Sequence, residues 1–334
     1  MPTDDIITLS QCLHTWLFTY RIHDLNPSSF ERYEGLYKNY ILNSSIGSIK
    51  LKDLKASHIQ TYYNSLVLEK NKLSSPIETI NKCLKSSLSQ ALKEGYILKN
   101  HCLYITLPKE HDNINNSDII RVFTIEKQKS FMNTALNSNN SLIYIFALGT
   151  GLRLAELLTL RWSDINLKEK TISITKTIKE TYTFDKNENR YYTIIEQPPK
   201  TTSSIREVSL IDNLIDLLQN HRKEQLLNRN ENIDIYFDHY LVFCAPSGVY
   251  LNSSNVRKSF KRILKKCNLA SDFRIHDLKH TFATRLFEKG VAPKTVQSFL
   301  GHSDVQTTLN IYTHVMKDTK NEAINTLNDL LNLN

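Results

Sequence analysis

The first third of the chain spaces its apolar residues as amphipathic helices do. Apolar side chains recur every three or four residues over 6–20, which predicts one buried helical face. Further helices are expected over 55–68, with Ser57 as N-cap, and from Ser74-Ser75-Pro76 to a stop at Gly95. Between them, Asn26-Pro27-Ser28-Ser29 predicts a turn before a helix with the apolar stripe Phe30, Tyr33, Leu36 and Tyr37. We therefore expect a helical domain over residues 1–108.

A different pattern follows the polar stretch 109–121, which we interpret as a linker. Helical spacing and strand-like alternation then succeed one another, with helices expected at 126–136 and 141–148 and strands at 171–177, 191–195 and 205–210. The charged residues 179–190 predict a hairpin extension. Helices resume after Ile211. The second domain, 122–334, is therefore expected to combine helices with a small antiparallel β-sheet, which makes the chain mainly α.

The charge balance favours an anionic partner. The chain holds 42 basic and 34 acidic residues, a net charge of +8, and nucleic acid is the commonest partner of such a chain. No long basic run occurs, so folding must assemble any basic surface. Lys82, Lys85 and Lys93 share the fourth predicted helix. Such lysines usually form a solvated face, but they are also candidates for contacts with DNA phosphates.

The remaining composition excludes several classes of protein. With 40% hydrophobic residues the chain can build packed cores. The five cysteines are scattered and form no CxxC pair, which argues against a disulfide framework and a zinc finger. The longest apolar stretch is too short to cross a bilayer, and the N-terminus does not have the pattern of a signal peptide. We expect a cytoplasmic protein without membrane contact.

Two short motifs place basic residues at turns. Thr150-Gly151-Leu152-Arg153-Leu154-Ala155-Glu156 predicts a tight entry into a helix at Gly151, with Arg153 and Glu156 on one face. Pro198-Pro199-Lys200-Thr201, which Ser203-Ser204-Ile205-Arg206 follows, places Lys200 between two strands. The ordinary interpretations are an ion pair at a helix start and a solvated lysine. A lysine on such a turn can also reach into a cleft and donate a proton.

A third motif, His276-Asp277-Leu278-Lys279-His280, has helical spacing that puts His276 and Lys279 on one face. We expect His280 to be a structural histidine with its hydrogen bonds satisfied.

A fourth motif joins a histidine to a tyrosine. In Leu300-Gly301-His302-Ser303, Gly301 is expected to end a helix. Ser303 and Gln306 predict a capping box for the next helix. That helix would place Tyr312 about three turns after His302.

In this order, the four motifs closely resemble those of the tyrosine recombinases, also called the phage integrase family. T-G-L-R-x-x-E, the lysine turn, H-x-x-(R/K)-H, and L-G-H with a downstream I-Y-T-H are all present. The resemblance is strong over about residues 122–315, and the N-terminal region is similar to the family's helical, SAM-like core-binding domain. The hairpin and P-K-T-x-S-S-x-R most resemble integrases of conjugative transposons and temperate phages. Those often begin with a further arm-binding domain, which we expect this chain to lack, either naturally or because the sequence was shortened.

This resemblance implies a site-specific recombinase that integrates and excises a mobile element through a 3′-phosphotyrosine. Tyr312 would be the nucleophile, and it needs activation because a tyrosine hydroxyl has a pKa of about 10. The family assigns the other roles as follows: Arg153 and His302 bind the scissile phosphate, Lys200 protonates the leaving 5′-oxygen, His276 handles the tyrosine proton, and Glu156 braces the site. No metal-ligand cluster or Walker motif is visible in the sequence, and the phosphotyrosine conserves energy, so no cofactor is expected.

One position departs from the family pattern. The third motif normally ends H-x-x-R, but this chain carries Lys279. Lysine keeps the charge and loses the planar fork of arginine. The loss of one well-placed donor can slow such a reaction by about 10²–10³. Lys279 is either a natural variant that still works or an engineered change that slows cleavage.

The family also implies how the protein assembles. Double-stranded DNA is the expected partner, held in a C-shaped clamp of the two domains by dimers to tetramers, with an accessory DNA-bending or excision factor. The C-terminal stripe predicts a helix over about 317–331 that docks into a neighbouring protomer or packs on its own domain: Ala323, Ile324, Leu327, Leu330 and Leu331. Three alternatives stay open, namely a type IB topoisomerase, a DNA-binding protein without catalysis, and a basic helical scaffold.

Overall fold

The chain folds into two compact units, each with its own core. The computed structural model describes residues 6–70, 74–108, 120–138, 141–185 and 187–313. Unit 1 contains Met1–Ser117 and Thr181–Thr193, and unit 2 contains Asp118–Glu180 and Ile194–Asn334. Helices dominate both units, and the strands are short and antiparallel, which confirms the predicted fold class. The predicted linker at 109–121 lies almost wholly outside the described residues.

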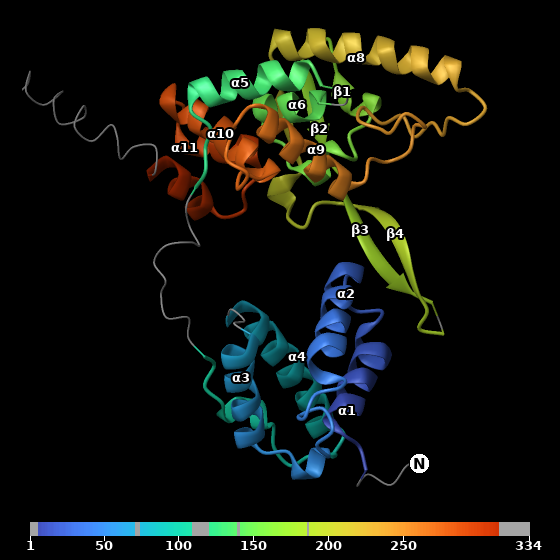
Figure 1. The fold of residues 1–334 in the computed structure, drawn as a ribbon, viewed down its shortest axis with the longest axis vertical. Coiled ribbons are helices and arrows are strands. Elements are labelled where there is room, and N and C mark those ends of the chain that lie inside the picture. Colours follow the sequence, from blue (N-terminus) through green and yellow to red (C-terminus); the bar gives the residue numbers. More distant parts are fainter. Residues whose placement is uncertain (1–5, 71–73, 109–119, 139–140, 186, 314–334) are drawn as a thin grey trace, which may run out of the picture. The chain divides into compact units, whose positions relative to one another are not determined.

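Unit 1 is a helical bundle closed around aromatic and aliphatic side chains (Figure 1). Its α-helices are α1 (Leu9–Thr15), α2 (Pro27–Leu36), α3 (Ala56–Lys70) and α4 (Ser74–Lys93). Shorter turns connect them: the π-helical η1 (Trp16–Arg21) and η2 (Tyr37–Ile41), and the 3-10 helices η3 (Leu51–Asp53) and η4 (His101–Tyr104). Thr8 and Gln11 form a capping box that starts α1. The predicted stop after α4 is present, since Gly95 has a left-handed φ of 82°.

The predicted N-cap of α3 is wrong. We expected Ser57 to cap this helix, but α3 already begins at Ala56. The backbone N–H of Lys55 instead donates to Nδ1 of His58 over 3.3 Å. A ring inside the first turn of α3 therefore accepts from the residue that precedes the helix, the reverse of the N-cap contact expected of Ser57.

The predicted hairpin is formed by β3 (Thr177–Phe184) and β4 (Arg190–Gln197). Its outer residues Thr181–Thr193 belong to unit 1. There the Phe184 ring packs edge-on against Phe18 and Phe30, at centroid distances of 5.7 and 5.2 Å. A segment from the second half of the sequence thus completes the first unit.

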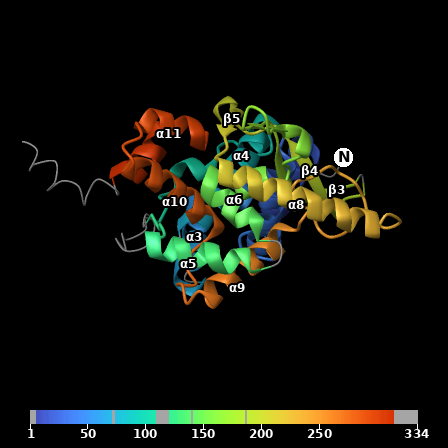
Figure 2. The ribbon, with the colours of Figure 1, turned by 90° about the horizontal axis from the view of Figure 1, so that it is seen from above.

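Unit 2 surrounds the apolar helix α6 (Leu142–Thr150), which is buried along almost its whole length. Six further α-helices are described in this unit: α5 (Ile125–Leu136), α7 (Leu154–Leu157), α8 (Asp212–Glu231), α9 (Ser253–Lys266), α10 (Ile275–Glu288) and α11 (Pro293–Leu300). Residues 305–313 are also helical. Figures 1 and 2 show α5 and α9 side by side, and α10 packs along α6. None of the helices in the described residues is long and apolar enough to cross a membrane.

A three-stranded antiparallel sheet adjoins these helices, in the order β1 (Ile165–Asn166), β2 (Thr171–Ile174) and β5 (Arg206–Ser209). Two 3-10 helices flank it, η5 (Trp162–Asp164) and η6 (Thr202–Ser204). Ile172 pairs with Val208, and both are buried. The same register sets Arg206 opposite Ile174 at the start of β5. This strand therefore begins with a charged residue directly after the lysine turn.

Candidate active site

Gly151 turns the chain between two helices and leads it to Arg153. It is the C-cap of α6, with a left-handed φ of 66°, and the next helix, α7, begins three residues later at Leu154. A Cβ at this position would lie 2.5 Å from the Phe282 ring, so only glycine fits. Arg153 then caps α7: its backbone N–H donates to Oε2 of Glu156 over 2.8 Å, and its Nη1 donates to Oε1 over 2.9 Å. The predicted pairing of these two residues is therefore present.

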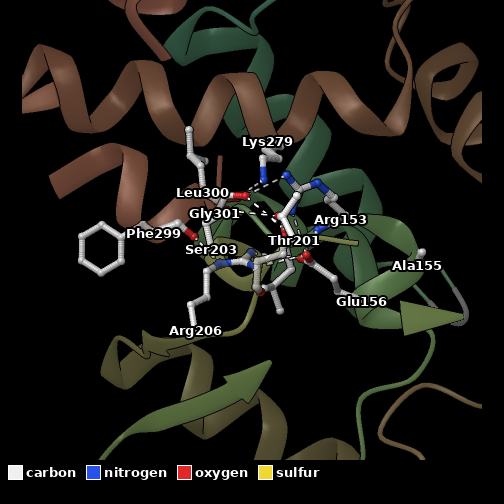
Figure 3. A network of polar contacts seen from close by, with 12 residues as sticks. Arg153, Ala155, Glu156, Thr201, Ser203, Arg206, Lys279, Phe299, Leu300 and Gly301 are labelled. Carbon is white, nitrogen blue, oxygen red and sulfur yellow. Dashed lines mark hydrogen bonds and ion pairs between the residues drawn. The ribbon is translucent and has the colours of Figure 1, made fainter. Parts of the chain in front are cut away.

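Glu156 is shared by two arginines. Its side chain is only 3% exposed, and Arg206 grips it with both ends of its fork, Nη1 to Oε1 and Nη2 to Oε2, each over 3.0 Å (Figure 3). Burial alone would raise the pKa of the Glu156 carboxyl. The hydrogen bonds and charge of Arg206, with the nearby charge of Lys279, outweigh it and lower this pKa below its usual value. The buried carboxylate is therefore ionised.

Three cationic side chains meet the last carbonyls of α11 (Figure 3). Arg206 Nε donates to the Phe299 carbonyl over 2.7 Å, Lys279 Nζ to that of Leu300 over 2.5 Å, and Arg153 Nη2 to that of Gly301 over 3.2 Å. Carbonyls at the end of a helix have no partner within it, and the helix dipole favours positive charge there. The C-terminus of α11 thus gathers two predicted site residues and Arg206.

Lys279 occupies the deepest position in this group. Its side chain is 1% exposed and its amine meets the Leu300 carbonyl. Burial, and then the charge of Arg153, lower the pKa of this amine well below its ordinary value. The lysine therefore ties α10 to the end of α11.

The histidines lie beside these cations. His276, in the first turn of α10, meets the His280 ring edge to face at 4.7 Å. Burial and the neighbouring His280 and Lys279 lower the pKa of His276 to about 4. His302 is buried, with Nδ1 3.0 Å from Oγ1 of Thr308, and burial and Lys279 lower its pKa to about 3. Both imidazoles are therefore neutral near pH 7.

The expectation for His280 is wrong. We predicted a structural histidine with its hydrogen bonds satisfied, but its Nδ1 is buried and has no hydrogen-bond partner among the described residues. The ring packs against His276 instead. Its position in α10 is set by packing rather than by a polar partner.

A cavity of about 700 Å³ opens in front of Arg153. Glu156, Lys200, Arg257 and Ser303 also line it. Arg153 keeps a third of its side chain exposed, and it also borders a smaller cavity of about 340 Å³ with His276. The structure therefore brings Arg153, Glu156 and Lys200 to one cavity and links it through Arg153 to His276.

Tyr312 lies in the helix 305–313, where its half-buried ring packs edge-on against Phe287 at 5.2 Å. It is not among the residues that line either cavity. The expected capping box before this helix is wrong, because the backbone N–H of Gln306 donates over 2.9 Å to the carboxylate of Asp304 and not to Ser303. The helix consequently begins one residue later than predicted.

The other predicted positions are simpler. Lys82, Lys85 and Lys93 are exposed on α4 in unit 1.

In the parts of the chain that the structure describes, no three His, Cys, Asp or Glu side chains are grouped to hold a metal ion. Sequence reasoning missed Arg206 as a site residue, although the P-K-T-x-S-S-x-R motif contained it.

Comparisons with known proteins match both parts of the chain. A model of the phage integrase family matches residues 119–319, and a model of the phage integrase N-terminal SAM-like domain matches residues 8–67. A XerC-like tyrosine recombinase of Caldanaerobacter subterraneus subsp. tengcongensis is 37% identical over 97% of this chain and 83% of its own length. The integrase of Staphylococcus phage L54a is 24% identical, over 97% of this chain and 94% of its own.

Solved structures share the fold. The Tn1549 transposon integrase in complex with a circular intermediate DNA superposes with a TM-score of 0.71 at 21% identity, covering 96% of this chain and 99% of that one. A lambda integrase dimer bound to a COC′ core site has a TM-score of 0.63 at 19% identity, covering 92% of this chain and 78% of that one.

Proposed function

The chain belongs to the phage integrase family of tyrosine recombinases, which cleave and rejoin DNA strands, and we propose that it uses Tyr312 as its covalent nucleophile. The observation that supports a phosphate site is the cavity in front of Arg153, whereas the choice of Tyr312 rests on the family's I-Y-T-H motif. Arg153 and Lys200 both line it, and the buried Glu156 carboxylate holds Arg153 from behind. A guanidinium fork fits the non-bridging oxygens of a phosphodiester.

In the proposed cleavage step, Oη of Tyr312 attacks the scissile phosphorus while the bond to the 5′-oxygen breaks. Lys200 gives a proton to the leaving 5′-oxygen, and the neutral ring of His276 accepts the proton of the tyrosine. The products are a 3′-phosphotyrosine and a free 5′-hydroxyl. Rejoining reverses these steps with a new 5′-hydroxyl, so the bond energy is conserved.

The other members of the site stabilise the charge that shifts on the phosphate. Arg153 and the neutral His302 donate hydrogen bonds to the non-bridging oxygens. Glu156 holds Arg153 in place. The Lys279 amine donates to the Leu300 carbonyl and so holds the end of α11 beside Arg153. The attack also requires the Tyr312 hydroxyl to reach this phosphate, whereas its ring packs on Phe287.

Double-stranded DNA is the proposed partner. Lys82, Lys85 and Lys93 are exposed and can approach phosphates from unit 1, and the basic residues of α9 can do so from unit 2. We further propose that dimers to tetramers assemble on DNA, with an accessory factor for bending or excision. The tail helix expected at 317–331 lies outside the described residues, and its docking into a neighbouring protomer stays a prediction.

The test is incubation with nicked, end-labelled DNA from the ends of the mobile element, followed by denaturing electrophoresis. The native chain should give a slowly migrating, protease-sensitive covalent species, and Tyr312→Phe should give none. Tyr240→Phe is the control, because Tyr240 is 64% exposed and does not line the cavity. A species that persists in Tyr312→Phe would reject this nucleophile. A chain that binds the DNA without forming the species would favour the non-catalytic alternative.

A further inference from the structure

Arg206 has no assigned role in the reaction, yet it is the most fully engaged side chain of the site. It starts β5, two residues after the 3-10 helix η6 ends at Ser204. Besides its two bonds to Glu156, its Nε donates to the Phe299 carbonyl over 2.7 Å and its Nη1 to the Ser204 carbonyl over 3.0 Å. One guanidinium therefore joins β5, α7 and the end of α11.

The two arginines on Glu156 differ in what remains available to a ligand. A guanidinium has five N–H groups in a fixed fork. Arg206 makes four hydrogen bonds with them, and its side chain is 6% exposed. Arg153 makes two, to Glu156 and Gly301, and its side chain is 33% exposed. Arg153 is thus equipped to grip a phosphate, whereas Arg206 is enclosed by protein.

The chain approaches Arg206 closely at Gly301. A Cβ at that glycine would lie 2.9 Å from Nη1 of Arg206 and 3.1 Å from its Cδ. Gly301 also has a φ of 60°, which favours glycine. The bend that leads to His302 therefore packs directly against the Arg206 guanidinium.

Charge makes this arrangement demanding. Arg153 and Arg206 both pair with one carboxylate, Glu156, in a site where Arg206 and Lys279 are almost fully buried. Without the Arg206 fork, the carboxylate would keep only its bonds to Arg153 and could rotate with it. The planar fork fixes the carboxylate plane, a constraint that a single ammonium donor does not supply.

We propose that Arg206 is a positioning residue of strand cleavage: it fixes Glu156, and through Glu156 it aims the free N–H groups of Arg153 at the scissile phosphate. The proposal rests on the function proposed above. Arg206 itself does not touch the DNA. Arg206 also binds the end of α11, to which Arg153 donates and which His302 directly follows. It therefore fixes the position of Arg153 relative to His302.

The first test compares single-turnover cleavage by the native chain, Arg206→Met and Arg206→Lys. Each protein is given a nicked DNA with an ordinary scissile phosphate and the same DNA with a neutral methylphosphonate there. A misplaced Arg153 should slow cleavage of the charged phosphate by about 10²-fold. The methylphosphonate carries no charge for Arg153 to neutralise, so its cleavage should fall by only a few-fold. Arg206→Lys should recover part of the loss, because it keeps the charge.

The second test is a double-mutant cycle with Arg153→Ala. If Arg206 acts through Arg153, Arg206→Met should add little to the loss that Arg153→Ala already causes. Arg229→Met is the matched control, because Arg229 is a half-buried arginine that pairs with Asp238 over 2.8 Å and lines neither cavity of the site. It should cleave both substrates like the native chain.

The outcomes separate the two proposals. Equal slowing of both substrates by Arg206→Met and Arg206→Lys, or losses that multiply in the cycle, would assign Arg206 a merely structural role and overturn this inference. Cleavage of the ordinary DNA at the native rate by Arg206→Met would overturn it as well. A native chain that cleaves neither substrate would instead reject the proposed function on which the inference rests.

Discussion

At the scale of single residues, Lys279 and Arg153 reach neighbouring carbonyls with very different side-chain ends. The side-chain nitrogen of Lys279 donates a hydrogen bond to the Leu300 carbonyl, and the side chain is buried. Arginine at this position could keep that contact with one N–H and turn another toward the phosphate. The family pattern and the local geometry therefore lead to the same expectation, that lysine gives a weaker grip.

We predict that Lys279→Arg cleaves nicked DNA faster, by about 10-fold or more, since one added donor can be worth up to about 10²–10³ in rate. The larger side chain must fit a full site, and overpacking usually costs about 1–3 kcal/mol, so the thermal midpoint should fall. Single-turnover cleavage and thermal unfolding measure the two effects. An arginine variant that cleaves no faster would show that Lys279 does not weaken the site.

The histidines predict how stability responds to pH. His302 and His276 have their pKa values lowered to about 3 and about 4 from 6.5. Between about pH 6.5 and 4 the unfolded chain therefore binds protons that the folded chain does not. The free energy of unfolding should fall as the pH is lowered through this window.

Thermal midpoints of the free protein between pH 7.5 and 4.5 test this expectation. The native chain should lose stability on acidification more steeply than His302→Asn or His276→Asn, which cannot take up these protons. His23→Asn, at an exposed position of unit 1, should follow the native chain. Parallel curves for all four proteins would contradict the lowered pKa values.

Residue patterns predicted a site residue best where its partner lies nearby in sequence. Arg153 and Glu156 are three positions apart, so helical spacing alone pairs them. Arg206 meets Glu156 across 50 residues and Phe299 across 93, which no local pattern encodes. His280 was misjudged for the same reason, because the satisfaction of a buried ring depends on side chains brought by other elements.

At the scale of elements, the end of α11 accepts hydrogen bonds from Arg206, Lys279 and Arg153, and Gly301 is the C-cap of this helix. We predict that Gly301→Ala lowers the thermal midpoint and slows cleavage, because alanine meets two penalties. A left-handed residue with a side chain costs about 1–2 kcal/mol, and the new Cβ would also push Arg206 away from Glu156.

Gly290→Ala is the matched control for this change. Gly290 follows α10 with a φ of 75°, but no atom lies within 4 Å of the place where its Cβ would stand. It should show the backbone penalty alone and retain cleavage. Thermal unfolding and single-turnover rates of the two variants give the comparison. Equal effects of both would mean that the contact with Arg206 contributes nothing.

Elements were predicted well where periodicity decides, and less well at their ends. The strand expected over 171–177 is two strands, because the alternation continues while the chain changes partner from β5 to β4. The register of side chains survives such a change, so the sequence pattern does not reveal it. Neither Ser57 nor Ser303 caps its helix: Ser57 lies inside α3, and Asp304 takes the place of Ser303, because several polar residues compete at each helix start.

At the scale of the whole molecule, the net charge of +8 predicts that DNA affinity depends on salt concentration. Each lysine that contacts a phosphate releases a counterion, so log affinity should fall linearly with log salt concentration. We predict that Lys82→Gln and Lys85→Gln each weaken DNA binding and reduce that slope by about one. Fluorescence anisotropy over a salt series measures it.

Lys168→Gln serves as the control, because Lys168 is exposed on the turn between β1 and β2 and takes part in none of the proposed contacts. It should leave the slope unchanged. Equal slopes for all these proteins would remove α4 from the DNA interface. The predicted clamp of both units around the duplex would then have to use another face of unit 1.

The close approach of Gly301 to Arg206 also has a consequence for how this protein can evolve. Because the guanidinium fills the space where a side chain would begin, neither position can drift without regard to the other. Relatives that carry a larger residue at position 301 should carry a smaller one at position 206, and a selection for revertants of Gly301→Ala should return second-site changes there. The two positions would then co-vary among relatives, although almost a hundred codons separate them.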